Sequence, residues 1–190
     1  MHDAVQNSRA GCRACDAFEV KAHLRIDGTI EDDLLGGLVR AARQDVERST
    51  GLALIDQSWR LVLDRWPASA TVPLRIHPVR EVLSVTLYGS EGEASLLTPE
   101  NYQVDTLSRP ARVHAEVIPP ALRAMNGIEI DFSAGFGESG TDVPDLLRRA
   151  ILLLVAHWYE FRAGFGPDDQ PVSYPAGYER MIAGYRAGRL

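Results

Sequence analysis

Cys12 and Cys15 are the first residues of the sequence whose type and spacing could support chemistry. A C-x-x-C pair can bind zinc or exchange disulfides, but zinc needs a second pair of ligands and thioredoxin-type exchange needs a βαβ setting. The sequence predicts neither, and His23 is the only nearby candidate ligand. We therefore interpret the pair as two reduced thiols, with a zinc enzyme or regulator as a weaker alternative.

Two further motifs resemble chemical sites in outline only. His157 and Glu160 form an H-x-x-E pair without the second histidine of an H-E-x-x-H motif, so we interpret His157 as a core or interface residue. The turn Gly135-Phe136-Gly137 precedes a helix but lacks the G-x-x-x-x-G-K-[ST] pattern of a phosphate-binding loop. No G-x-S-x-G elbow is present. The sequence predicts no enzyme, no cofactor and no metal site.

A helix over about residues 145–162 is apolar on nearly every side. Asp142 and Pro144 are residues that favour a helix start, and Asp145 complements the positive end of the helix dipole. At about 100° per residue, the apolar side chains fall on three stripes. These stripes contain Leu147, Ile151, Leu154, Trp158 and Phe161; Leu146, Ala150, Leu153 and His157; and Leu152, Val155 and Tyr159. Such a helix needs cover, part of which we expect from another subunit.

A second long helix is predicted over about residues 30–50. Thr29 and Asp32 suggest a capping box at its start, and Gly51 supplies a stop. Its single apolar stripe should pack against the helix at 145–162, and it contains Leu35, Leu38, Val39, Ala42 and Val46. Gly36 and Gly37 fall off that stripe, which suggests close approach of a neighbouring subunit; a tolerated weak spot or kink explains them equally well. With Tyr159 they are our candidates for the subunit interface.

The pattern changes to period two between the helices, which indicates strands. Residues 59–63 and 83–88 alternate apolar and polar side chains, prolines and glycines cut the region into short pieces, and residues 128–132 form a last strand. The predicted fold class is α+β, a helical core with a small inserted antiparallel β-sheet. We divide the chain into helical segments at 1–56, the β insertion at 57–132, the central helix at 133–163 and a tail at 164–190.

The tail is rich in tyrosine and arginine. From 171 to 190 it holds three Arg and one Glu, a local charge of 3 − 1 = +2 in a chain of net charge −6. Because tyrosine and arginine often anchor interfaces, we predict that the tail docks onto a partner. The candidate contact residues are Tyr174, Tyr178, Arg180, Tyr185, Arg186 and Arg189. The alternative is a final amphipathic helix, with Met181 and Ile182, that packs on its own domain.

Composition limits the remaining classes of protein. The chain has 190 residues, of which 45% are hydrophobic and 24% charged, as in an ordinary folded protein. Its longest apolar run, residues 150–156, is far shorter than the roughly 20 residues of a membrane span, and we expect synthesis in the bacterial cytoplasm and no membrane partner. The acidic balance disfavours a protein that grips nucleic acid over a broad surface.

Two long blocks of the sequence resemble a known family. The first is EVKAHLRIDGTIEDDLLGGLVRAARQDVERSTGLALIDQSW, and the second contains FSAGFG, DVP and LLRRAILLLVAHWYEFR. With the YQVD segment between them, the chain from about Phe18 to Phe161 resembles the head-to-tail connector (adaptor) proteins of long-tailed phages and gene transfer agents.

The resemblance implies a virion structural protein at the neck of a phage or gene transfer agent particle, with no chemistry of its own. We expect a ring below the portal, dodecameric to match it, that joins head to tail and lets double-stranded DNA pass without sequence-specific binding. The expected partners are the portal protein, a downstream stopper or tail-terminator protein, and further copies of the chain. In connectors of this family the C-terminal segment typically reaches toward the portal. The alternative is a DNA-packaging accessory protein that binds duplex DNA through its Arg-rich tail.

Overall fold

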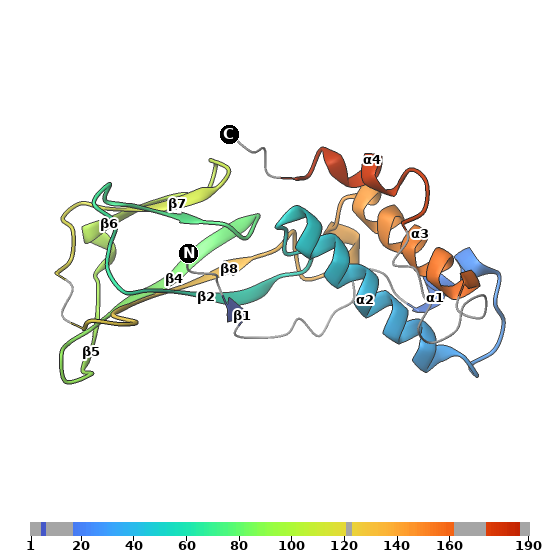
Figure 1. Ribbon diagram of the computed structural model, residues 1–190, viewed down its shortest axis with the longest axis horizontal. Coiled ribbons are helices and arrows are strands. Elements are labelled where there is room, and N and C mark those ends of the chain that lie inside the picture. The colour runs from blue at the N-terminus through green and yellow to red at the C-terminus, as the bar shows by residue number, and fades with distance from the viewer. Residues whose placement is uncertain (1–4, 7–16, 121–122, 162–173, 187–190) are drawn as a thin grey trace. The chain divides into compact units, whose positions relative to one another are not determined.

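The computed structural model describes residues 5–6, 17–120, 123–161 and 174–186. The chain divides into two compact units, which we call the β unit (Met1–Gly11 and Asp56–Phe136) and the helical unit (Cys12–Ile55 and Gly137–Leu190). Figure 1 shows the strands in the first and the helices in the second. The α+β class predicted from the sequence is confirmed.

The helical unit is built around two long helices that lie side by side (Figure 1). Its helices are α1 (Ala17–Leu24), α2 (Asp32–Thr50), α3 (Asp145–Phe161) and α4 (Tyr178–Ala183). A short 3-10 helix, η2 (Gly140–Asp142), precedes α3. The predicted packing of the helix at 30–50 against the helix at 145–162 is therefore confirmed.

The two ends of α2 differ in how closely they follow the sequence signals. Gly51 adopts the left-handed conformation with φ of 72°, and its N–H donates to the Glu47 carbonyl at 2.9 Å, as a helix stop requires. The predicted capping box does not form at the other end. Glu31 stands at the N-cap position without a side-chain cap, and the Thr29 carbonyl accepts the Asp32 N–H at 3.2 Å. Thr29 thus lies too early in the turn to cap α2.

One side of α3 is covered within the chain and another is not. The buried side consists of Leu147, Ala150, Ile151, Leu154 and Val155. Leu146 and Phe161 keep 52% and 49% of their surface exposed. The helices of the described residues therefore cover only part of the apolar surface that the sequence assigns to α3.

The β unit contains two antiparallel sheets where the sequence suggested one. The five-stranded sheet has the order β1-β2-β8-β4-β5 and the three-stranded sheet the order β3-β7-β6. The first consists of β1 (Val5–Gln6), β2 (Gln57–Leu63), β4 (Val79–Tyr88), β5 (Ala94–Leu96) and β8 (Ile128–Ala134). The second consists of β3 (Thr71–Leu74), β6 (Tyr102–Asp105) and β7 (Ala111–Ala115), with a 3-10 helix, η1 (Pro99–Asn101), before β6.

The inward faces of the two sheets form the core of the β unit. In the five-stranded sheet Leu61 is opposite Ile130, which is opposite Val85, and all three are buried. The three-stranded sheet buries Val72 and Val113, which are opposite one another. Polar side chains alternate with these along the strands, as in sheets with one solvated face. The outward face of the larger sheet is therefore free to carry charged groups.

Among the described residues, no helix is both long enough and apolar enough to cross a membrane.

Candidate functional site

Three residues of the helical unit form a polar contact between α2 and the C-terminal segment. Asp45 is only 8% exposed, and its carboxylate accepts hydrogen bonds from the Tyr178 hydroxyl at 2.8 Å and the Tyr174 hydroxyl at 3.0 Å. The two tyrosine rings stack with centroids 5.1 Å apart and an interplanar angle of 5°. Arg48 donates to the same carboxylate at 3.0 Å. We call Asp45, Tyr174 and Tyr178 the tyrosine latch.

The environment keeps both latch hydroxyls protonated. Burial, followed by the hydrogen bond to Asp45, raises the pKa of Tyr178 well above its ordinary value. The same two causes, in the same order, raise the pKa of Tyr174. Both hydroxyls therefore act as donors to the carboxylate throughout the neutral range.

The latch changes the interpretation of the tail. Tyr178 and Ile182 are fully buried, as in a helix that packs on its own domain, so the Tyr178 side chain is occupied within its own chain. Tyr174 keeps 39% of its surface exposed, and Arg180 is exposed. Arg186 pairs with Glu179 at 2.6 Å, and Tyr185 is half-buried. Arg189 lies outside the described residues, and contact of these residues with a partner stays a prediction.

The three candidates for a subunit interface have different surroundings. Gly36 is buried, contrary to its expected position off the apolar stripe, whereas Gly37 is half-buried with the Arg40 guanidinium near it. Tyr159 is half-buried, and its hydroxyl donates to Glu31. Gly36 lies directly after Leu35, so the covered side of α2 is wider than a single stripe. The role of these residues between subunits stays a prediction.

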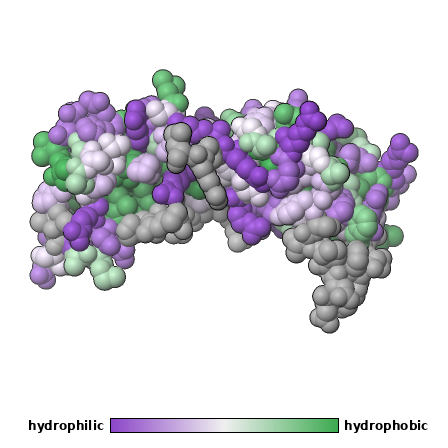
Figure 2. All heavy atoms as spheres, turned by 45° about the horizontal axis from the view of Figure 1, so that its top comes forward, coloured by the Kyte–Doolittle hydropathy of each residue, from purple (hydrophilic) through white to green (hydrophobic). Residues whose placement is uncertain are grey.

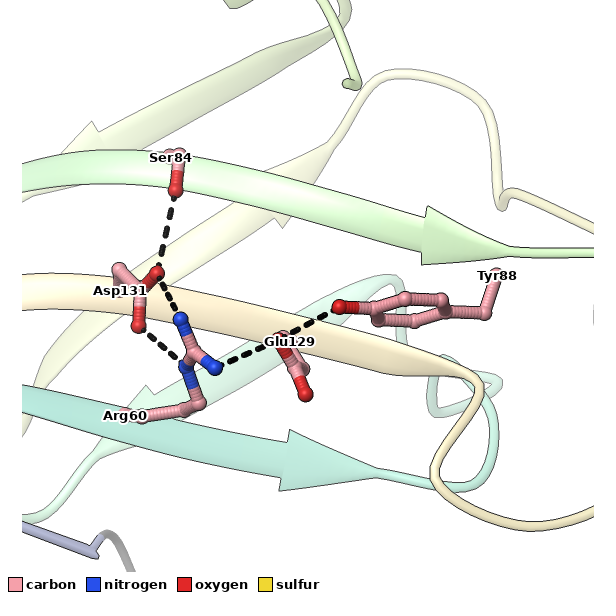
Figure 3. Close-up of polar contacts among 5 residues, drawn as sticks. All are labelled: Arg60, Ser84, Tyr88, Glu129 and Asp131. Carbon is pink, nitrogen blue, oxygen red and sulfur yellow. Dashed lines mark hydrogen bonds and ion pairs between the residues drawn. The ribbon is translucent and has the colours of Figure 1, made fainter. Parts of the chain in front are cut away.

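A charged cluster on the five-stranded sheet was not singled out from the sequence. Arg60 on β2 donates to both oxygens of Asp131 on β8, at 2.7 and 2.8 Å, and forms an ion pair with Glu129 at 3.0 Å. Tyr88 on β4 donates to Glu129 at 2.9 Å, and Ser84 donates to Asp131 at 3.4 Å (Figure 3). The cluster thus ties together the three central strands of the sheet.

The donors of the charged cluster keep their protons and hold the three strands together. The hydrogen bond to Asp131 is the main cause that raises the pKa of Arg60 above an already high value. The hydrogen bond to Glu129 is the main cause that raises the pKa of Tyr88. Neither group gives up a proton near neutral pH, so both act as fixed donors. The signal was available in the sequence, because Glu129 and Asp131 alternate with apolar residues on a predicted strand.

Two of the motifs that resembled chemical sites, the glycine turn and His157, contact neighbouring side chains of the chain. A Cβ added at Gly137 would lie 2.2 Å from the carboxylate of Asp142, so this turn encloses an acid and not a phosphate. That carboxylate accepts the Ser139 N–H at 2.9 Å. His157 packs with its ring centroid 4.6 Å from that of Phe161. Within the described ranges no group of three or more His, Cys, Asp or Glu could hold a metal ion, and Cys12 and Cys15 lie outside them.

The exposed surface mixes hydrophilic and hydrophobic side chains over the described residues of the face in Figure 2. The larger exposed apolar side chains of the helical unit are Phe18, Ile30, Leu34, Leu146 and Phe161. In the β unit they are Leu83, Leu96, Val104, Leu107, Val117, Ile118 and Met125. Apolar side chains that stand singly on a surface are ordinary in folded proteins, so these positions alone do not define an interface.

Comparisons with known proteins point in one direction. Residues 18–96 match a family model described as phage gp6-like head-tail connector protein. No curated protein matches the chain in sequence.

Three solved structures are similar over nearly the whole chain, each with 28% sequence identity. A chain in the neck of an empty GTA particle, computed with C6 symmetry, has a TM-score of 0.83, and the match covers 99% of this chain and 97% of that one. A chain in the virion of a native gene transfer agent (GTA) particle has a TM-score of 0.81, with 98% and 96% covered. A chain in the neck of a native GTA particle, computed with C12 symmetry, has a TM-score of 0.79, with 100% and 97% covered.

Proposed function

We propose that this chain is a phage head-tail connector protein. In the neck of a phage or gene transfer agent particle it forms a ring below the portal and joins head to tail. The observation that carries the proposal is the structural similarity to a chain in a GTA neck over 99% of this chain's length. A match of that extent includes both units, so it concerns the whole fold and not one common motif.

The ring is supported by symmetry and by the incomplete cover of α3. The similar neck structures were computed with C6 and C12 symmetry, both of which suit a ring of twelve copies. In the single chain Leu146 and Phe161 remain about half exposed on α3. Apolar side chains of this size are worth roughly 1.5 to 3 kcal/mol each when fully buried, so a neighbouring copy that covers them would stabilise a ring.

In this proposal the protein is a structural ring that seals the junction of head and tail, and it catalyses no reaction. One surface of the ring binds the portal, the opposite surface binds a stopper or tail-terminator protein, and DNA passes through the centre. A net charge of −6 suits such a passage, because a surface that does not neutralise phosphates does not hold DNA in place.

We propose that the portal contact lies in the tail. Tyr174, Arg180, Tyr185, Arg186 and Arg189 remain the candidates. Removing the whole tail is a poor test, because it would also remove the buried Tyr178 and Ile182. The double variant Arg180→Glu/Arg186→Glu keeps both buried residues, and it should weaken binding to purified portal rings while the circular dichroism spectrum stays unchanged. Unchanged portal binding would show that these two arginines lie elsewhere.

The function as a whole is tested in particles. Deletion of the gene should give filled heads without tails, and complementation should restore joined particles seen by electron microscopy. Mass spectrometry of purified particles should detect the chain, with ring density at the neck. Particles that assemble normally without the chain would refute the proposal.

The DNA-packaging alternative makes an opposite prediction. It requires binding of duplex DNA by the purified chain, weakened steeply by salt and by loss of Arg180 and Arg186. For a connector we expect little binding at a physiological ionic strength of about 0.15 M. The comparisons favour the connector.

A further inference from the structure

Helix α2 has a second apolar side, which points away from the core of the helical unit. At about 100° per residue, its buried residues centre on Leu35 and Val39, and Leu34, Gly37 and Ala41 lie on the other side of the helix. Leu34 keeps 41% of its surface exposed, Ala41 is exposed and Gly37 is half-buried. The outward side of a surface helix is normally polar. We call Leu34, Gly37 and Ala41 the α2 face.

Helix α3 also has an apolar outward side. Leu146, Leu153 and Ala156 lie on it, away from the buried residues of this helix. Leu146 keeps 52% of its surface exposed, and Leu153 and Ala156 are half-buried. The exposed Arg149 and Glu160 lie on the same side. We call Leu146, Leu153 and Ala156 the α3 face.

The two faces point in different directions. Helices α2 and α3 contact one another, and α1 and α4 each contact both of them, so the four helices share one core (Figure 1). Because each face lies opposite the buried side of its helix, the α2 face and the α3 face point away from each other. A closed ring of identical copies requires two different surfaces of this kind on each copy. The helical unit alone carries both.

The shapes of the two faces are complementary. Gly37 and Ala41 are one helical turn apart, so the α2 face has a shallow place where a partner helix can come close. The α3 face instead projects two leucines. A Cβ added at Gly37 would meet only the end of the Arg40 side chain, at 3.8 Å. The described chain therefore does not require a glycine there, although glycine weakens a helix relative to other residues.

We propose that the α2 face of one copy packs against the α3 face of the next copy, with a leucine of the α3 face seated over Gly37 and Ala41. The inference rests on the proposed ring and specifies one of its contacts. In such a ring each copy has one neighbour on either side, so the occupant of each face is a second copy of the chain. Because the two faces differ, the contact is head-to-tail, which is the kind that closes into a ring.

The variant Gly37→Gln tests the α2 face. Glutamine favours a helix and its Cβ has room in the single chain, so the melting temperature of the monomer should stay unchanged or rise. In the ring the added side chain overfills the contact, so the concentration for half-maximal assembly should rise by about tenfold or more. Sedimentation velocity measures assembly of the free chain and of the chain on purified portal rings.

The matched control is Gly184→Gln. Gly184 has helical backbone angles at the end of α4, and a Cβ added there has nothing within 4 Å. It belongs to neither face, so this variant should assemble as the unmodified chain does.

Cross-linking identifies the occupant of the α2 face. In a Cys12→Ser/Cys15→Ser background, Gln44→Cys places a thiol beside the α2 face and Arg149→Cys places one beside the α3 face, both at exposed positions. A short bis-maleimide linker should join the two variants into covalent dimers when they are mixed, and it should join neither variant to itself. Denaturing gel electrophoresis detects the dimers. Adding Gly37→Gln to the first variant should reduce them.

Each outcome supports the contact or overturns it. If Gly37→Gln assembles as well as the unmodified chain, or if it lowers the melting temperature of the monomer, the α2 face is not a contact between copies and the ring stands. If Gln44→Cys is cross-linked to itself, or if the mixture gives no dimers, α3 is not the partner of α2. If the unmodified chain forms no ring in solution or on portal rings, the ring and the contact fall together. Weakened assembly of a stable Gly37→Gln monomer, with dimers only in the mixture, supports the contact.

Discussion

The geometry of the tyrosine latch predicts how much stability one substitution removes. The Tyr178→Phe variant keeps the buried ring and removes one hydroxyl, which donates to the buried Asp45 at 2.8 Å. Hydrogen bonds to a charged group contribute roughly 1.5 to 3 kcal/mol, and Asp45 keeps donors at Tyr174 and Arg48. We therefore expect the free energy of unfolding of the helical unit to fall by about 1.5 to 2 kcal/mol.

Urea unfolding followed by circular dichroism at 222 nm measures this change, because all four α-helices of the described residues belong to the helical unit. Tyr102→Phe is the matched control, since that tyrosine lies in the β unit and its hydroxyl has no hydrogen bond to the described residues. In an Asp45→Ala background the Tyr178→Phe change should cost much less, because the acceptor is gone.

The alkaline pH dependence provides a second measurement of the latch. The unfolded tyrosine has a pKa of about 10, and the folded-state pKa of Tyr178 is raised. The contribution to stability is therefore fully present below pH 10 and is lost as pH rises through the folded pKa. In that window the unfolded state releases a proton that the folded state keeps, so the free energy of unfolding falls by up to about 1.4 kcal/mol per pH unit.

Tyr178→Phe should show a shallower alkaline decline than the unmodified chain. The reasoning is refuted if Tyr178→Phe changes the free energy of unfolding by less than about 0.5 kcal/mol, the range of ordinary surface substitutions, and leaves the alkaline decline unaltered.

Three further predictions concern the β unit, the turn before α3 and the exposed side of α3. Arg60→Met leaves two half-buried carboxylates without their shared cation. In thermal melts it should lower the free energy of unfolding by about 1 to 3 kcal/mol. The control Arg80→Met removes an exposed ion pair worth at most about 1 kcal/mol. Equal losses would contradict the role of the charged cluster. Gly137→Ala places a Cβ 2.2 Å from the Asp142 carboxylate and should lower the free energy of unfolding by about 1 to 3 kcal/mol. The control Gly184→Ala places a Cβ with nothing within 4 Å and should change that free energy by no more than about 0.5 kcal/mol. Urea titration measures both variants. Leu146→Ser, at a position 52% exposed, should leave the melting temperature of the monomer nearly unchanged and weaken ring assembly in sedimentation velocity; unaltered assembly would remove Leu146 from the interface.

The long helices could be predicted because their signals are local. Gly51 ends α2 in the left-handed conformation that only glycine adopts without strain, and the buried side of α2 follows the expected spacing through Leu35, Val39 and Ala42. The stripe of α3 at Leu147, Ile151 and Leu154 is buried in the same way. Helical periodicity needs no knowledge of distant residues, so the sequence carries it directly.

Strand burial was less predictable because one inserted residue changes the face that a side chain occupies. Leu83 alternates with polar neighbours in the same way as Val85, and the pattern predicts that both are half-buried on one face. The structure has a register shift between Val82 and Ser84, and Leu83 is 50% exposed whereas Val85 is fully buried. The bulge depends on how β4 pairs with β8, a non-local property that alternation alone does not contain.

The docking of α4 is the feature that most changes the functional interpretation, and its cause lies in α2. Asp45 lies one residue before the buried Val46 and three after the buried Ala42, so its position already implies burial of a carboxylate. A buried carboxylate requires donors, and Arg48 on α2 supplies only one. The tail supplies two further donors, because its tyrosines are uncharged residues long enough to reach the carboxylate. An unexplained acid on an apolar helix face is therefore a usable sign that a distant segment docks there. In this chain part of the tail therefore belongs to the core, while Tyr174, Arg180 and Arg186 keep exposed surface.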